Sequence, residues 1–158
     1  MGWDPMMDGV DHVNAYSRGR TELGRYLSNF AHAPVRTVDG TFASIEAYWH
    51  WLGVPSAAGD AKEALRRLHG ADAKKRGREL RRKFGTCQVP DFELRIRLAV
   101  RAKLAAAPHL VASDEATLPI AHYYVSRDGI VIDQTGSFPW LVEIWQEEVA
   151  SLRDALLR

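Results

Sequence analysis

One carboxylate of this chain, Glu46, lies in a stretch that is rich in aromatic residues. Trp49 and His50 follow three and four residues later, so all three share one face if the segment is helical. Tyr48 and Trp51 lie in the same stretch. A carboxylate that aromatic rings partly shield from water is suited to proton transfer. The pattern therefore predicts Glu46 as a catalytic carboxylate, with a solvated helix residue as the alternative.

Several residues near Glu46 are candidates for binding a substrate. Ser28 and Asn29 can hydrogen-bond a ribose hydroxyl or a base edge, or they can satisfy a turn of their own backbone. Phe30 and Tyr48 offer flat rings on which a base can stack, unless they are core residues. His50 can orient Glu46 across one helical turn or bind a phosphate, and its alternative is a surface imidazole.

Basic residues are concentrated in the middle of the chain. Between Lys62 and Lys103 there are 14 lysines and arginines against 5 aspartates and glutamates, although the net charge of the whole chain is only +1. The imbalance indicates a phosphate or polyanion partner, or helices with basic solvent-exposed faces. Arg76 and Arg78 are predicted to clamp a diphosphate, because guanidinium groups pair with phosphates through two hydrogen bonds.

Other chemistries find little support in the sequence. The chain has no Gly-x-x-x-x-Gly-Lys-Ser/Thr loop, no His-Glu-x-x-His and no Cys-x-x-Cys, so neither a metal site nor a cofactor is predicted. The chain has a single cysteine, Cys87, and a lone cysteine is more often a packing residue than a nucleophile. His122 lies beside two tyrosines and is predicted to line the substrate site, unless it simply belongs to a strand.

Short elements must position these residues. The alternation around Asp39-Gly40 predicts a β-hairpin over residues 35–43. Ser44 is a candidate N-cap for a helix that carries Glu46 and ends near Gly53. We predict further helices over residues 60–70, 72–83 and 92–107 and after Ser137, and a second hairpin over residues 118–133.

These elements predict an α+β fold, mostly α-helical with short β-hairpins, in a single domain over residues 21–158. Residues 1–20 are rich in glycine, aspartate and methionine and are predicted to form a loose lead-in. No stretch is apolar over the length of a membrane span, and the acidic N-terminal segment does not resemble a secretory signal. We therefore expect a cytoplasmic location without membrane association. The oligomeric state stays open.

The order of motifs from Arg25 to Trp51 resembles that of the NADAR, or YbiA-like, family. Members of that family have a Ser-x-Phe element, a proline, an Asp-Gly hairpin, and a helix with a glutamate and an aromatic residue. The corresponding residues here are Ser28 to Phe30, Pro34, Asp39-Gly40, Glu46 and Tyr48. Weaker matches follow in Ala73 to Arg78 and in Arg101 to Leu104, whereas the C-terminal third diverges.

The resemblance implies an N-glycosidase with a YbiA-like fold. Family members remove ADP-ribose from guanine in DNA or cleave ribosylated riboflavin intermediates, and no cofactor is needed because water is the nucleophile. The resemblance implies that Glu46 stabilises an oxocarbenium-like transition state or activates water. The family's late Asp-x-x-Trp-Gly motif is absent. Asp128 and Asp133 are its possible replacements, and Asp133 is the preferred second catalytic residue.

The missing motif favours a different class of protein as the alternative. In that case the chain is a module that binds ADP-ribose or ADP-ribosylated nucleic acid without cutting it. A second alternative is a basic DNA-binding protein that uses the helices between Lys62 and Lys103.

Overall fold

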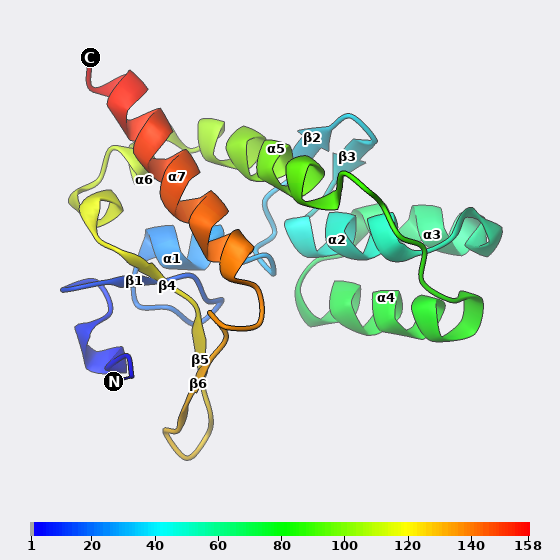
Figure 1. Ribbon diagram of the computed structural model, residues 1–158, viewed down its shortest axis with the longest axis horizontal. Helices are drawn as coiled ribbons and strands as arrows, with labels where there is room; N and C mark the ends of the chain where they lie inside the picture. Colours follow the sequence, from blue (N-terminus) through cyan, green and yellow to red (C-terminus); the bar gives the residue numbers. More distant parts are fainter. Residues whose placement is uncertain (1) are drawn as a thin grey trace. The chain divides into compact units, whose positions relative to one another are not determined.

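Helices dominate the computed structural model, which describes residues 2–158, and account for 54 % of it (Figure 1). Short paired strands complete an α+β fold, which confirms the predicted fold class. Two compact units can be distinguished within the chain. One is residues 29–103, and the other combines the segment up to Ser28 with Leu104–Arg158.

The unit of residues 29–103 is built from one hairpin and a group of helices. Its elements are β2 (Val35–Thr37), β3 (Gly40–Phe42), α2 (Ile45–Gly53), α3 (Asp60–Ala64), α4 (Gly70–Phe84) and most of α5 (Phe92–Ala105), with 3-10 turns at Ser56–Ala58 and Leu65–Arg67. The hairpin is antiparallel with Asp39 in its turn, as predicted. The helix predicted over residues 60–70 is shorter, because the chain tightens into the 3-10 turn and Leu68 is extended.

Helix α2 begins where the sequence predicts it to begin. The Ser44 hydroxyl accepts the backbone N–H of Ala47 at 3.0 Å and donates to the Leu68 carbonyl at 2.9 Å. The first bond caps the helix, and the second ties its start to the segment that precedes α4. The helix ends at Gly53, and the extended Val54 leads into Pro55.

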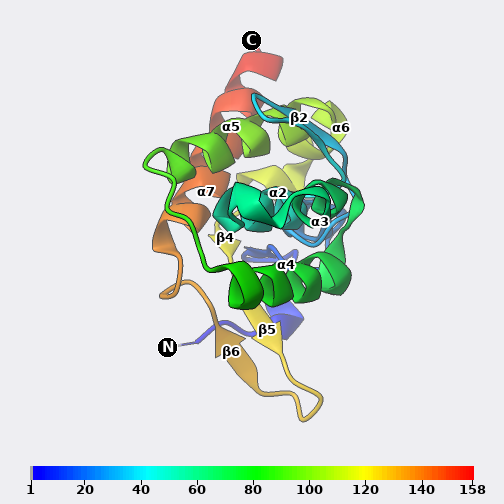
Figure 2. The same ribbon diagram turned by 90° about the vertical axis from the view of Figure 1, so that its right-hand side faces the viewer.

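Helix α4 packs along α2 (Figures 1 and 2). Ala73, Gly77 and Leu80 are its buried residues, at the spacing of one helix face. Gly77 is required at the centre of this contact, because a Cβ there would lie 2.2 Å from Cγ of His50. Leu80 joins a hydrophobic cluster with Val54, Ala58 and Leu65, which holds the far end of the two helices together.

Tyr48 is a core residue, and its predicted role as a stacking surface is wrong. The residue is fully buried, and its ring packs against Phe42 with centroids 4.6 Å apart. Its hydroxyl donates to Asp39 Oδ2 at 2.6 Å, and burial raises its pKa far above the usual value. Arg95 holds both oxygens of Asp39 at 3.0 and 2.8 Å. The turn of the hairpin is therefore fixed by α2 and α5, and no face of Tyr48 is left for a base.

The second unit combines both ends of the chain. Its elements are a 3-10 turn at Pro5–Met7, β1 (Val13–Asn14), α1 (Glu22–Leu27), α6 (Pro108–Val111), a 3-10 turn at Asp114–Thr117, β4 (Ile120–Ala121), β5 (Tyr123–Val125), β6 (Val131–Asp133) and α7 (Pro139–Leu156). Strands β1 and β4 pair in parallel, and β5 and β6 form the predicted second hairpin. Helix α7 has Pro139 at its first position, but Phe138 rather than Ser137 is its N-cap.

The segment that the sequence predicts as a loose lead-in is largely ordered and packed. Residues 12–15 are buried, and β1 lies within them. The Asp8 carboxylate accepts the backbone N–H groups of Asn14 and Arg20 at 2.9 and 2.7 Å. The Asn14 side chain bonds both the N–H and the carbonyl of Tyr123 at 3.0 Å. The prediction fails because the bonds between Asn14 and Tyr123 join residues 109 positions apart, which local composition does not reveal.

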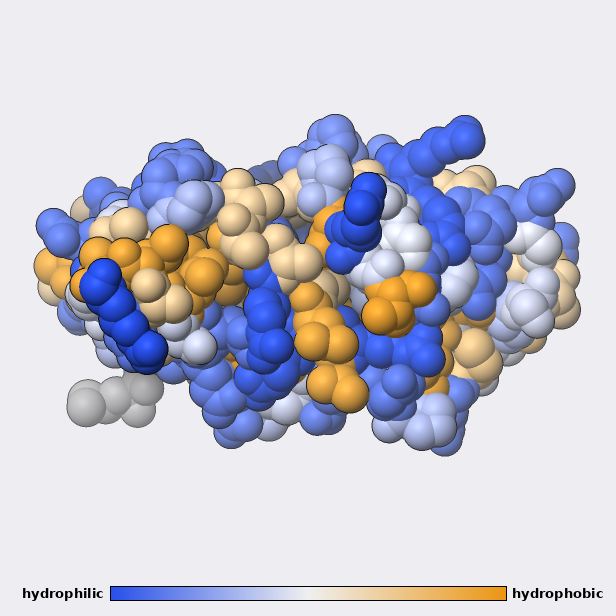
Figure 3. Space-filling model, turned by 90° about the horizontal axis from the view of Figure 1, so that it is seen from above, coloured by the Kyte–Doolittle hydropathy of each residue, from blue (hydrophilic) through white to orange (hydrophobic). Residues whose placement is uncertain are grey.

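Hydrophobic residues form separate patches divided by hydrophilic ones on the face shown in Figure 3. Among the described residues, no helix has both the length and the apolar character needed to cross a membrane.

Candidate functional site

Helix α2 brings Glu46 and His50 together on one face. His50 Nε2 lies 3.1 Å from Glu46 Oε1, one helical turn away. The pair is shielded from water, since only 13 % of the Glu46 side chain and 4 % of the His50 side chain are exposed. In the tautomer that carries its proton on Nε2, His50 donates to the carboxylate and fixes the position of Oε1.

Glu46 has one carboxylate oxygen without a protein partner among the described residues, namely Oε2. The residue lies in the first turn of α2, where the helix dipole stabilises a negative charge. Its backbone N–H donates to the Asn29 carbonyl at 2.9 Å, which holds the chain before the hairpin against the start of α2. Glu46 is thus fixed through its backbone and one oxygen, and the other oxygen can act on a ligand.

Three buried side-chain polar atoms of residues 29–103 have no hydrogen-bond partner among the described residues. They are Asn29 Oδ1, His50 Nδ1 and Arg81 Nε. An unsatisfied buried polar atom costs about 1–3 kcal/mol, so such atoms are few in native structures and each one calls for an explanation. Gly77 packs against the imidazole and explains His50 Nδ1, whereas Asn29 Oδ1 is left without a donor among the described residues. Asn29 therefore stays a candidate substrate-binding residue.

Phe30 is only partly buried and follows Asn29 directly. Its carbonyl accepts the N–H of Gly70 at 3.1 Å, which connects it to the start of α4. The ammonium group of Lys74 lies 5.7 Å from the ring centroid. Lys74 was not singled out in the sequence, although it lies one turn before Arg78 on the same helix and shares its face.

Arg76 and Arg78, the predicted diphosphate clamp, lie on different faces of α4. Both are exposed on α4, and Arg76 instead lies 3.3 Å from Glu79 Oε2. Residues two positions apart on a helix point in nearly opposite directions from its axis. Arg81, at three positions from Arg78, shares its face, and the same spacing rule applied to the sequence could have found it.

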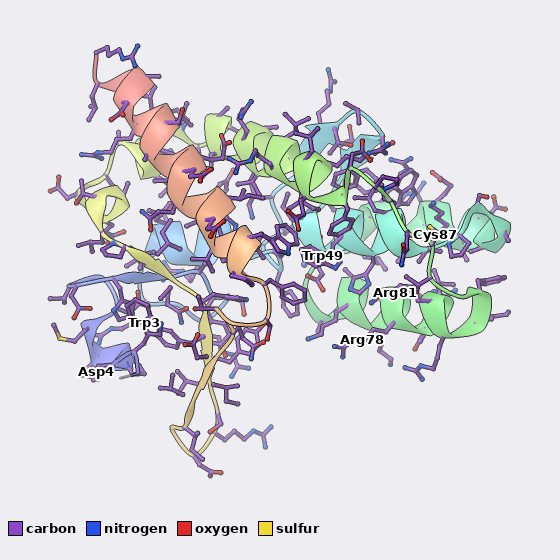
Figure 4. The ribbon with its side chains drawn as sticks, in the orientation of Figure 1. Trp3, Asp4, Trp49, Arg78, Arg81 and Cys87 are labelled. Carbon is purple, nitrogen blue, oxygen red and sulfur yellow. The ribbon has the colours of Figure 1, made fainter. Side chains whose placement is uncertain are left out.

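Figure 4 shows where these side chains lie. Arg81 is located between the ribbons of α2 and α4, and Arg78 lies beside α4. Trp49 projects from α2, and its ring meets the edge of Phe92 with centroids 4.9 Å apart. This helix pair thus carries a carboxylate, an imidazole and two arginines, a set that suits a ligand with a sugar and an anionic group.

Ser28, His122 and Asp133 belong to the other unit, so the site described above is formed by residues 29–103 alone. Ser28 is buried and ends α1. Asp133 is exposed at the end of β6, where its Oδ1 accepts the N–H of Thr135 at 2.9 Å. This bond gives Asp133 a structural role in the turn that follows β6.

His122 is anchored within its unit. Its Nδ1 lies 3.0 Å from the Ala15 carbonyl, and its ring meets Trp145 edge-on with centroids 5.2 Å apart. Burial lowers the pKa of His122 below its usual value, although the Ala15 bond and the charge of Asp133 act in the opposite direction. The folded state therefore favours the neutral imidazole.

Acidification should consequently destabilise this unit through His122. Below the usual histidine pKa of about 6.5 the unfolded chain binds this proton more readily than the folded chain, so the free energy of unfolding falls with decreasing pH. We expect His122→Gln to show a flatter pH dependence of stability between pH values of about 7 and 5. Urea denaturation at several pH values measures how the free energy of unfolding depends on pH. The exposed His109 supplies the control, and equal slopes for His109→Gln and His122→Gln would contradict this account.

Among residues 2–158, no group of three or more His, Cys, Asp or Glu side chains could hold a metal ion. Comparison of the chain with family models, with curated proteins and with solved structures found no match. The site is therefore interpreted from its own geometry and from the resemblance of its motifs.

Proposed function

We propose that this protein is a hydrolase that cleaves the N-glycosidic bond of an ADP-ribose-type or ribosyl-nucleobase substrate, such as ADP-ribosylated guanine in DNA. The observation that carries the proposal is the Glu46–His50 pair. It consists of a shielded carboxylate, held at 3.1 Å by an imidazole, with a second oxygen that none of residues 2–158 binds. The motif order of the NADAR family places a catalytic glutamate at the same position.

Cleavage of this bond leaves positive charge on the sugar as the base departs. Glu46 Oε2 stabilises that charge or takes a proton from the attacking water, whose oxygen forms the new bond to the anomeric carbon. The electron pair of the broken bond goes to the base, which is then protonated. His50 positions the carboxylate, and Asn29 and Phe30 bind the sugar or base. Asp133, Ser28 and His122, which the sequence also suggested, belong to the other unit, so we propose no role for them at this site.

Incubation of the purified protein with ADP-ribosylated DNA tests the proposal. Release of free ADP-ribose, followed by mass spectrometry, is the expected result, and a ribosylated nucleobase serves as a second substrate. Both substrates remaining intact while bound would overturn the hydrolase assignment. A nucleotide substrate agrees with the cytoplasmic location that we propose from the sequence.

The second candidate is a binding module without catalysis, which the exposed basic side of α4 favours. Lys75, Arg76 and Lys83 all point into solvent there. Such a surface binds phosphates of nucleic acid, and its affinity falls steeply with salt. Salt-dependent binding of unmodified DNA, without release of ADP-ribose from the modified form, would favour this candidate.

A further inference from the structure

Arg81 has a guanidinium group without a partner among the described residues. Its Nε is buried and makes no hydrogen bond, and no carboxylate lies within ion-pair distance of the side chain. The aliphatic part of the Arg81 side chain lies close to the end of α2. A Cβ added at Gly53 would be at ordinary contact distance from Arg81 Cδ. A buried donor of a charged group that stays unpaired is costly, so a ligand that supplies an acceptor would gain binding energy there.

Two other partly buried arginines of this unit, Arg66 and Arg95, have carboxylate partners. Arg66 bonds Glu63 at 2.6 Å, and Arg95 bonds Asp39 and Asp91 at 2.8 and 3.0 Å. Both also fix elements of the fold, since Arg66 donates to the Asp39 carbonyl at 2.7 Å and covers the ring of Phe42. Arg81 is also partly buried, but it has no such carboxylate partner among the described residues. Contacts within the fold therefore do not account for its charge.

The position of Arg81 relates it to the catalytic pair. Gly77, one turn earlier on α4, packs against His50. Gly53 lies one turn after His50 on α2, and a Cβ added there would lie 3.4 Å from Arg81 Cδ. The two helices therefore run in the same direction along their contact, with Glu46 near the start of α2 and Arg81 near its end. Seven residues of α2 separate Glu46 from Gly53, which is about 10 Å along the axis. A sugar that carries a phosphate can bridge such a distance when the arginine side chain extends.

We propose that Arg81, with Arg78 on the same face of α4, binds the phosphate or diphosphate group of a ligand whose sugar lies at Glu46. This inference rests on the proposed function and names the part of the substrate that α4 recognises. The planar guanidinium matches two phosphate oxygens, and Arg78 adds a second positive charge three residues away.

Calorimetric titration of Arg81→Gln with ADP-ribose and with inorganic pyrophosphate tests the subsite. We expect the dissociation constant of ADP-ribose to rise about tenfold or more, as for loss of a charged hydrogen bond, while Arg81→Lys gives an intermediate value. Arg82→Gln is the matched control, because it removes the same charge from the neighbouring exposed position. It should change affinity less than about threefold. Thermal unfolding of each variant shows whether the fold is kept. If Arg81→Gln does not fold, Arg78→Gln takes its place in the titration.

The outcomes separate this proposal from the proposed function. Equal affinity losses in Arg81→Gln and Arg82→Gln would overturn the subsite, because only net charge would then matter. No binding of either probe by the wild-type protein, or hydrolysis with an unchanged KM in Arg81→Gln, would also overturn it. Arg81-dependent binding without hydrolysis would instead uphold the subsite and reject the hydrolase.

Discussion

Replacing Glu46 by glutamine should reduce turnover of an ADP-ribosylated substrate by about 10²–10⁴-fold, the range for loss of a general acid or base. The amide keeps the size of the side chain and can still accept a hydrogen bond from His50 Nε2, 3.1 Å away. It supplies no negative charge to a developing oxocarbenium ion and cannot accept a proton from water. Single-turnover rates of ADP-ribose release measure the effect, and the dissociation constant of ADP-ribose should stay within about threefold.

Glu93 provides the control for this experiment. It lies in the first turn of α5, as Glu46 lies in the first turn of α2, but it is exposed. Glu93→Gln should therefore leave the rate unchanged. If Glu46→Gln retained the wild-type rate, or if both variants lost activity equally, the role of Glu46 would have to be abandoned.

Replacing Gly77 by alanine should lower the free energy of unfolding by about 1–3 kcal/mol, as for overpacking of a core contact. The added Cβ would lie 2.2 to 2.4 Å from three atoms of the His50 side chain, so either α4 or the imidazole must move. The higher helix propensity of alanine offsets only about 1 kcal/mol of this cost. Movement of His50 would also release Glu46, so catalysis should fall together with stability. Guanidinium denaturation and the hydrolysis assay measure the two effects.

Gly53→Ala is the matched control in the same helix contact. A Cβ at Gly53 would meet Arg81 Cδ at 3.4 Å and Thr86 at 3.8 Å, which are ordinary contact distances. This variant should be as stable as the wild type or slightly more stable, because a helical glycine is replaced. Similar losses in both variants would show that α2 and α4 do not approach most closely at Gly77.

Features that depend on neighbouring residues could be predicted from the sequence. Ser44 caps α2 through a bond to a residue three positions away, and Glu46 meets His50 across one turn. The hairpin follows in the same way from Asp39-Gly40, since Gly40 adopts the positive φ of 107° that glycine favours. These contacts arise within one element, so local spacing is sufficient to specify them.

The tertiary structure decided which side chains are free to bind a ligand. Tyr48 and Phe30 are both aromatic residues near Glu46, yet Tyr48 is enclosed by Phe42 and bonded to Asp39 while Phe30 keeps exposed surface. Arg81 became a candidate only because α4 packs against α2 near Gly53 and leaves its Nε buried, with no hydrogen-bond partner in residues 2–158.

The difference between these two groups of features has a physical cause. A helix cap, a hairpin turn and an i,i+4 pair are set by the geometry of a few consecutive residues. Burial, and the choice of partner for a buried polar group, depend on which distant elements come into contact, as when Asn14 bonds Tyr123. The sequence by itself therefore determined the Glu46–His50 pair, and only the packing of α4 on α2 decided which arginine of α4 keeps a buried Nε without a partner among the described residues.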